Sequence, residues 1–131
     1  MSEIEILQEF KSNLITFVDE LIEQFPQEGD LIILRIFLND QIPIQDIINT
    51  FILMINKNDN QIRKMVKEKN ELFFLNYNII NVFNVGIGKS KINNFKRIWC
   101  SGCLDNQDKD VIWKWFEVFV HIGDKYTKCK L

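Results

Sequence analysis

Two cysteines near the C-terminal third of the chain have a spacing that is used for redox and metal chemistry. Cys100 and Cys103 form a CxxC pair directly after Trp99, and such pairs occur in thioredoxin-type centres and in zinc sites. In the thioredoxin fold a later proline faces the disulfide, but both prolines of this chain, Pro26 and Pro43, precede the pair. The acidic residues that follow the pair also oppose a thiolate. The sequence therefore argues against thioredoxin-type chemistry.

A zinc site needs four ligands, and only His121 and Cys129 are available to complete the pair. If a helix begins near Asp105, its rise of about 1.5 Å per residue puts His121 roughly 24 Å along that helix. The four side chains then cannot meet on one ion within one chain. We therefore expect no metal and no other cofactor, with His121 as a partly buried helix residue and Cys129 in a frayed tail.

Other catalytic motifs are incomplete. The segment NVGIGKSK contains the Gly-Lys-Ser of a phosphate-binding loop, but Phe83 occupies the position where that loop requires its first glycine. The chain has a single histidine with no nucleophile placed beside it, and its acidic residues are scattered along the expected helix surfaces. We expect a protein that is not an enzyme and has no small-molecule substrate.

The first half of the chain has the hydrophobic spacing of helices. A long amphipathic helix is predicted at about residues 2–25, with Ser2 as its N-cap, Glu5 three residues later, and Pro26 as its stop. A shorter and more buried helix is predicted at 31–38, ending near Asn39 and Asp40. Pro43 suits the first turn of a central helix with a wide apolar face. The segment NKNDNQ predicts a turn, after which helical spacing resumes at Ile62 and continues to Lys69.

The second half divides into an ambiguous segment and a clear helix. Around residues 76–91 an irregular loop or short extended stretch is as compatible with the sequence as a helix, and a short helix is expected at 92–99. The last helix is predicted at about 105–127, capped by Asp105 with Asp108 at its third position. Its expected core stripe consists of Val111, Ile112, Trp115, Phe116, Phe119 and Ile122. Trp113 and Val120 extend the apolar face further round, so this helix is either nearly enclosed or presents aromatic surface to a partner. Burial of these aromatics in the core is the favoured interpretation, and the alternative is a partner surface at Trp113, Glu117 and Val120.

These elements predict an all-α fold, a single domain over residues 1–131 built as a bundle of about five to six helices. The three cysteines, and the lack of a basic and apolar leader, favour a reducing intracellular compartment. No apolar run approaches the roughly 20 residues that span a bilayer, so a soluble protein without a membrane partner is expected. The chain has no alanine but 21 isoleucines and 14 asparagines, which indicates an AT-rich genome.

The net charge of −2 conceals an asymmetry between the halves of the chain. Residues 1–56 carry ten acidic and two basic side chains, whereas residues 57–131 carry fourteen basic and eight acidic ones. This split can serve an anionic partner, pair the two halves of one fold, or pair two copies head to tail. The candidate nucleic-acid contacts are Lys57, Arg63, Lys64, Lys67, Lys89, Lys91, Lys96 and Arg97.

Two segments, FVDELIEQFP at residues 17–26 and FKRIWCSGCLDNQDKDVIWKWFEVFVHIGDKY at residues 95–126, resemble a family of small helical proteins of nucleocytoplasmic large DNA viruses, the giant viruses of the mimivirus and phycodnavirus kind. The resemblance touches both ends of the chain and brings no known activity. Cys100 and Cys103 depart from the family pattern, in which Asn and Asp-like residues occupy this turn.

Two functions follow as expectations. The first is a non-catalytic viral protein-interaction module that self-associates or binds a virion component or a host factor. The alternative is a nucleic-acid-associated protein of viral replication or packaging that uses the basic segment 57–97. Either protein would work inside the host cell, in the cytoplasm or the viral factory, and the first could be packaged in the virion.

Overall fold

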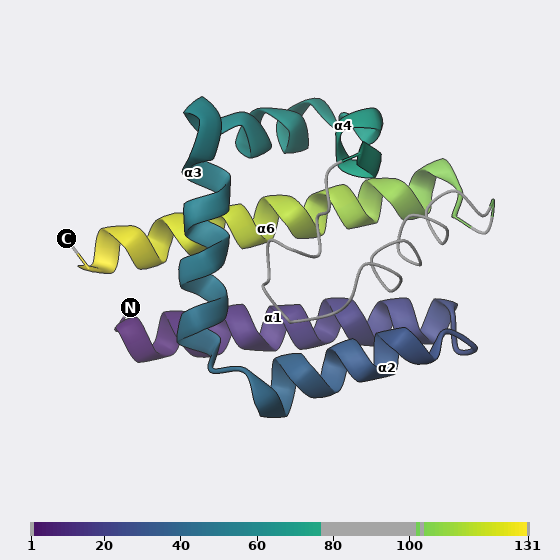
Figure 1. The fold of residues 1–131 in the computed structure, drawn as a ribbon, viewed down its shortest axis with the longest axis horizontal. Coiled ribbons are helices and arrows are strands. Elements are labelled where there is room, and N and C mark those ends of the chain that lie inside the picture. The colour runs from purple at the N-terminus through teal and green to yellow at the C-terminus, as the bar shows by residue number, and fades with distance from the viewer. Residues whose placement is uncertain (1, 77–101, 103, 131) are drawn as a thin grey trace.

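The structure is a computed structural model that describes residues 2–76, 102 and 104–130. The regular secondary structure of these residues is entirely helical, which confirms the predicted all-α fold (Figure 1). The α-helices are α1 (Glu3–Gln24), α2 (Gly29–Ile36), α3 (Ile44–Glu68), α4 (Glu71–Asn76) and α6 (Asn106–Lys130), and a π-helical turn, η1 (Phe37–Gln41), directly follows α2. Apart from Asn76, the segment expected to be irregular and the short helix expected at 92–99 lie outside the described residues.

The long helices α1 and α6 lie antiparallel, and the other elements pack around this pair (Figure 1). Near one end Tyr126 Oη donates a hydrogen bond to Glu3 Oε1 at 3.1 Å, and near the other Gln24 Nε2 donates to Asp108 Oδ2 at 3.1 Å. Helix α2 runs back along the outer side of α1, while α3 crosses both long helices near the chain termini.

Both long helices have the N-terminal caps that the sequence predicts. Ser2 Oγ accepts the backbone N–H of Glu5 at 3.2 Å. At α6 the capping is reciprocal, because Asp105 Oδ1 accepts from Asp108 N at 2.8 Å and Asp108 Oδ2 accepts from Asp105 N at 3.2 Å. Helix α1 ends at Gln24, two residues before Pro26. The boundaries predicted for α1 and for the start of α6 are confirmed, and α6 continues three residues beyond its predicted end.

Helix α3 is divided by the turn that the segment NKNDNQ predicts. Asn58, Asp59 and Asn60 all have positive φ angles, of 52°, 58° and 64°, a backbone region that Asn and Asp tolerate better than most residues. We call residues 44–56 the first arm of α3 and residues 61–68 its second arm. The second arm ends at Lys69, which is also left-handed with φ 53°. The short helix α4 follows, and its first turn is capped by Asn70, whose Oδ1 accepts from Phe73 N at 3.0 Å.

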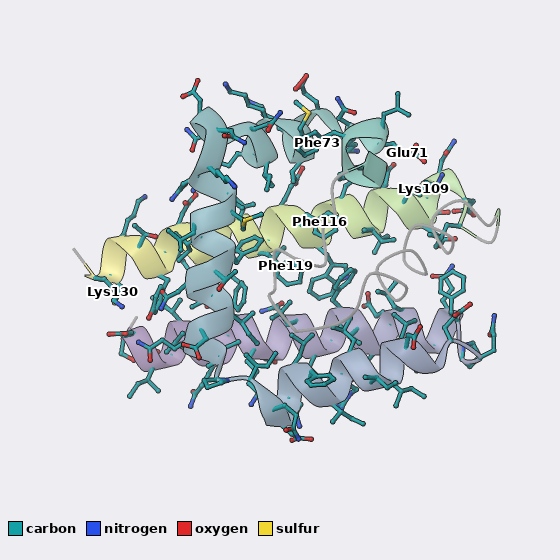
Figure 2. All side chains as sticks on the ribbon, in the orientation of Figure 1. Glu71, Phe73, Lys109, Phe116, Phe119 and Lys130 are labelled. Carbon is teal, nitrogen blue, oxygen red and sulfur yellow. The ribbon has the colours of Figure 1, made fainter. Side chains whose placement is uncertain are left out.

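Aromatic side chains fill the space between α1, the first arm of α3 and α6. Phe119, which is fully buried, projects from α6 into this cluster (Figure 2). Its ring centroid lies 5.7 to 6.5 Å from those of Phe10, Phe17, Phe51 and Trp115, distances typical of favourable aromatic pairs. The buried apolar residues that complete the core of α1 are Ile6, Leu14, Val18 and Leu21.

A buried glycine, Gly123, lies where α3 and α6 approach one another. A methyl group built at Gly123 would lie 3.4 Å from Ile52 Cγ1 and 3.7 Å from Ile55 Cδ1 and Phe51 Cδ1. This is ordinary van der Waals contact, so the position accommodates a small side chain but not a large one. Glycine has a low helix propensity, and this glycine lies at the point where α3 crosses α6.

Candidate functional site

The partner surface expected on α6 is only partly exposed. Trp113 is buried, at 4% exposed, which agrees with the core interpretation, so this ring is not part of a partner surface. Val120 is half-buried and Glu117 is exposed. On the expected core stripe of the same helix, Val111 is 44% exposed and Trp115 is half-buried, so the buried face of α6 is rotated toward Trp113.

The reason for this rotation is the position of the second arm of α3 and of α4. Lys109 Nζ lies 3.0 Å from Glu71 Oε1, Lys69 Nζ lies 3.1 Å from Asp110 Oδ1, and Arg63 pairs with Asp124. Lys109, Asp110 and Asp124 occupy the same side of α6 as Trp113, at separations of four, three and eleven residues. The labelled side chains of Lys109 and Glu71 approach each other there (Figure 2). The chain's own helices thus cover the side on which a partner was expected.

The basic residues proposed as nucleic-acid contacts divide into three groups. Lys57, Lys64 and Lys67 are exposed on the bend and second arm of α3, with Lys64 Nζ 3.6 Å from Asp59 Oδ2. Arg63 is engaged inside the fold. The remaining candidates, Lys89, Lys91, Lys96 and Arg97, lie outside the described residues.

Arg63 forms the most complete polar contact between α3 and α6. Its Nη1 and Nη2 donate to Asp124 Oδ2 and Oδ1 at 2.8 and 2.6 Å, and Asn56 Oδ1 accepts from Nη2 at 2.9 Å. The hydrogen bonds from the Arg63 guanidinium lower the pKa of Asp124 below its ordinary value, against the opposing effect of partial burial. This bidentate geometry fixes the orientation of the second arm, so Arg63 has a structural role.

The charge asymmetry of the sequence is used in part inside the fold. Lys125 Nζ contacts both carboxylate oxygens of Glu9, at 2.9 and 3.1 Å, and Lys130 Nζ lies 3.8 Å from Glu3 Oε1. Both pairs join the acidic α1 to the basic end of α6. The charge pattern left three alternatives open. For these residues the structure shows one of them, the pairing of the two halves of the chain within one fold.

A small depression lies between α1 and α6. It has a volume of about 80 Å³ and contains two carboxylates, those of Glu20 and Asp108. Glu20 Oε2 accepts a 2.8 Å hydrogen bond from Trp115 Nε1, and Asp108 caps α6. Pockets that enclose small molecules usually measure about 300 to 1,000 Å³. The depression is too small for such a ligand, and both of its carboxylates have structural contacts.

The described histidine and cysteine have no metal-site geometry. His121, expected to be partly buried, is exposed, and Cys129 is exposed within α6 rather than beyond its end. Within residues 2–76, 102 and 104–130, no three His, Cys, Asp or Glu side chains are grouped in a way that could hold a metal ion. Cys100 and Cys103 lie outside this part of the chain.

Sequence reasoning missed an apolar surface on α2, which we name the α2 outer face and define as Ile32, Ile33 and Ile36. Ile32 and Ile36 are 45% and 46% exposed, and Ile33 is half-buried. The opposite side of the helix packs inward through Leu31 and Leu34, and Leu38 of η1 is buried beyond its end. The available signal was the run of apolar residues all around the helix, which we interpreted as burial.

The spacing of these isoleucines distinguishes them from other exposed apolar side chains. Ile32 and Ile36 are four residues apart and therefore adjacent on the helix surface. On α6, Val111 and Val118 are also exposed, at 44% and 38%, but they are two turns apart with the exposed Lys114 between them. The α2 outer face is thus a continuous apolar strip.

Acidic residues lie at both ends of the α2 outer face. Glu28 and Asp30 are at the N-terminal end of α2, and Asp40 is exposed in η1. Arg35 lies on the flank, with its Nε 2.5 Å from Asp19 Oδ1, so this cation is already paired. Charged side chains of both signs therefore flank the apolar strip.

Comparisons with known proteins add no further assignment. No protein-family model matches the chain, and neither a curated protein nor a solved structure is detectably similar to it. None of the described helices combines the length and apolar composition that crossing a bilayer requires.

Proposed function

We propose that this chain is a non-catalytic protein-interaction module that binds its partner through the α2 outer face. The observation that carries the proposal is the adjacent pair Ile32 and Ile36, each nearly half exposed on a helix whose other side is packed against α1. Complete burial of an isoleucine side chain contributes about 1.5 to 3 kcal/mol, and roughly half of that contribution is still available here. Contiguous apolar surface of this kind typically marks contact sites.

The proposal includes a viral protein that acts inside the host cell, in the cytoplasm or the viral factory, or within the virion. Its support is the AT-rich residue usage and the resemblance of residues 17–26 and 95–126 to the giant-virus family. The partner is accordingly a virion component, a host factor or another copy of the chain. Only the α2 outer face, and not α6, is assigned to the contact.

Site-specific photo-cross-linking tests the assignment. We expect benzoylphenylalanine at position 36 to form an adduct with a protein partner in the cells that produce the protein. The same residue at position 53 is the matched control, because Leu53 is 73% exposed on α3, outside the α2 outer face. The identified partner must then bind the purified wild-type chain and bind an Ile32→Gln/Ile36→Gln variant more weakly.

Light scattering during size-exclusion chromatography tests whether the partner is another copy of the chain, because it measures the molar mass of the protein in solution. A molar mass that rises with concentration in the wild type, but not in Ile32→Gln/Ile36→Gln, assigns the contact to copies of the chain. A monomer at all concentrations, together with equal cross-linking from positions 36 and 53, would contradict the proposed function.

A second candidate function is nucleic-acid binding, favoured by the exposed side chains of Lys57, Lys64 and Lys67. These contacts would be made to phosphates, so binding should weaken steeply with salt. Fluorescence anisotropy with labelled single-stranded and duplex DNA at low salt tests this function. A Lys64→Gln/Lys67→Gln variant should bind more weakly, and no binding by the wild type removes this candidate.

A further inference from the structure

The bend in α3 divides the described helices into two sets. Before it lie α1, α2, η1 and the first arm of α3, which we call the N-terminal half, and after it lie the second arm, α4 and α6, which we call the C-terminal half. We propose that two copies of this chain exchange their C-terminal halves and form a dimer. In this dimer α6 of each copy packs on α1 and the first arm of the other copy, and α3 is one continuous helix. The contact does not use the α2 outer face.

The backbone of the bend, residues 57–60, has the properties of a hinge. Asn58, Asp59 and Asn60 are three consecutive left-handed residues, with φ of 52°, 58° and 64°. L-amino acids adopt this conformation singly, because the Cβ atom then lies too close to the following carbonyl oxygen. A continuous right-handed helix relieves this crowding at all three positions. All four side chains of the hinge are exposed, so straightening it uncovers no core residue within the hinge.

The second arm is bound to α6 and therefore moves with it. Figure 1 shows the second arm leaving the first arm in a new direction, beside α6. Three ion pairs join the second arm and the residues that follow it to α6: Arg63 with Asp124, Lys69 with Asp110, and Glu71 with Lys109. All six residues lie after the hinge. These pairs hold the C-terminal half together whatever conformation the hinge adopts.

The contacts between the two halves reform in the dimer. Lys125 Nζ lies 2.9 Å from Glu9 Oε2, and the Phe119 ring centroid lies 5.9 Å from that of Phe10 and 6.5 Å from that of Phe51. Each of these contacts joins an element before the hinge to α6. After exchange the two residues of each pair come from different copies and keep the same neighbours. Apart from the hinge, the dimer therefore retains the interactions of the monomer, which makes such an exchange a low-cost route to a dimer.

The charge of the chain changes sign at the hinge. Residues 1–56 carry ten acidic and two basic side chains, and residues 57–131 carry fourteen basic and eight acidic ones. Opposite charges attract an N-terminal half to a C-terminal half whether or not both belong to one copy, and two N-terminal halves repel each other. The charge pattern thus guides two open copies toward the reciprocal arrangement, in which each acidic half meets a basic half.

Mixing two charge-reversal variants tests the exchange. Alone, Glu9→Lys and Lys125→Glu each place like charges at the contact between α1 and α6. An exchanged dimer of the two variants contains one native pair and one reversed pair, so both contacts again join opposite charges. Because α6 must leave the Phe119 cluster before it can exchange, the variants are unfolded in urea and refolded together at high protein concentration. We expect a species of twice the chain's molar mass that unfolds at least about 3 °C above either variant refolded alone.

Arg63→Asp and Asp124→Arg are the matched control pair. Both positions lie after the hinge and travel in the same half, so exchange leaves the like charges of each variant together. Their mixture should therefore unfold at the temperatures of the separate variants. Circular dichroism verifies that every variant is folded before mixing. A control mixture that gains as much stability as the first pair would contradict the exchange of whole halves.

Substitutions in the hinge assign the exchange to the bend in α3. Asn58→Ala/Asp59→Ala/Asn60→Ala favours a continuous helix, because alanine has the highest helix propensity and lacks the tolerance of asparagine for positive φ. We expect its dimer-to-monomer ratio after refolding to be at least about tenfold that of the wild type, measured by size-exclusion chromatography with light scattering. Asn58→Gly/Asp59→Gly/Asn60→Gly is the matched control, since glycine adopts positive φ without strain, and its ratio should not exceed that of the wild type.

The outcomes are separate from those of the proposed function. If mixing Glu9→Lys with Lys125→Glu raises neither the molar mass nor the unfolding temperature, the exchange is wrong. Equal dimer fractions in the alanine and glycine variants also overturn it. Ile32→Gln/Ile36→Gln should leave the dimer unchanged, and loss of the dimer in this variant would assign self-association to the α2 outer face instead of the exchange. Specific cross-linking from position 36 bears only on the function proposed for that face.

Discussion

The aromatic cluster around Phe119 and the α2 outer face are both apolar, but only one of them is covered. Phe119 is fully buried and lies close to rings from α1, the first arm of α3 and its own helix. Ile32 and Ile36 are each nearly half exposed, on a helix that packs against α1 on one side. The same residue class thus stabilises the fold in one region and is available to a partner in the other.

The difference follows from the position of each helix in the fold. Helix α6 is contacted by α1 and by α3, and the second arm of α3 and α4 lie along its Trp113 side. Helix α2 lies at the edge, with α1 between it and α6 (Figure 1). Apolar composition alone therefore does not distinguish a core residue from a contact-surface residue. In this fold the two differ in how many helices pack around them.

The strongest test of the covered region is Phe119→Ala. We expect the free energy of unfolding to fall by about 3 to 5 kcal/mol, because a large buried ring is removed and a cavity remains. Urea unfolding followed by circular dichroism measures the change. Val118→Ala is the control on the adjacent, 38% exposed position, and it should cost about 0.5 kcal/mol or less. Similar losses in the two variants would contradict the cluster as the centre of the core.

The crossing of α3 and α6 is tested by enlarging Gly123. Gly123→Leu should reduce the free energy of unfolding by about 1 to 3 kcal/mol, since the added carbons enter space next to Ile52 and Ile55. Gly123→Ala is the matched control, because its methyl group fits at contact distance and alanine favours the helix by up to about 1 kcal/mol. Thermal unfolding should place the alanine variant at or above the wild type. A leucine variant as stable as the alanine variant would contradict the close crossing.

The contact between Arg63 and Asp124 predicts a pH dependence of stability. Because the pKa of Asp124 is lowered in the folded state, the contact stabilises the fold above the ordinary carboxyl pKa of about 4. This contribution is lost as the pH falls through the lower folded pKa. Near neutral pH, Asp124→Asn should cost only about 1 kcal/mol, since partial exposure screens the pair.

Urea midpoints between neutral pH and about pH 2 measure this dependence, and the lower limit lies below the ordinary carboxyl pKa. The stability difference between the wild type and Asp124→Asn should narrow as the pH falls. Lys64→Gln is the control, because its 3.6 Å pair with Asp59 is highly exposed. The stability difference between this variant and the wild type should therefore change little with pH. A difference that stays constant over this range would show that the ionised carboxylate does not stabilise the fold.

The smallest stability effect is expected at the uncovered region. Ile36→Gln should change the free energy of unfolding by about 0.5 kcal/mol, because the side chain is already nearly half exposed and glutamine is a good helix former. Urea unfolding beside Phe119→Ala makes the comparison direct. A loss above about 2 kcal/mol would mean that Ile36 is part of the core, which would remove the basis for a contact surface there.

The candidate surface was predicted less well than the fold. The sequence indicated that α2 is strongly apolar, but apolar residues on every side of a helix are compatible with burial and with an unpartnered face. For Trp113, which lies beside the expected core stripe, the sequence left open whether the ring is in the core or faces a partner. Only the positions of Lys69, Glu71 and Arg63 beside α6 reveal why this ring is buried.

By itself the sequence determined where the described helices begin, bend and end. The cap of Ser2 on Glu5 and the reciprocal pair of Asp105 and Asp108 join residues three positions apart, and the turn at residues 58–60 needs only residues that tolerate positive φ. Such interactions form within a few residues, so the local sequence specifies them. Tertiary structure decided which apolar faces are covered, because that depends on where distant helices come to lie. Trp113 is therefore in the core, while Ile32 and Ile36 remain outside it.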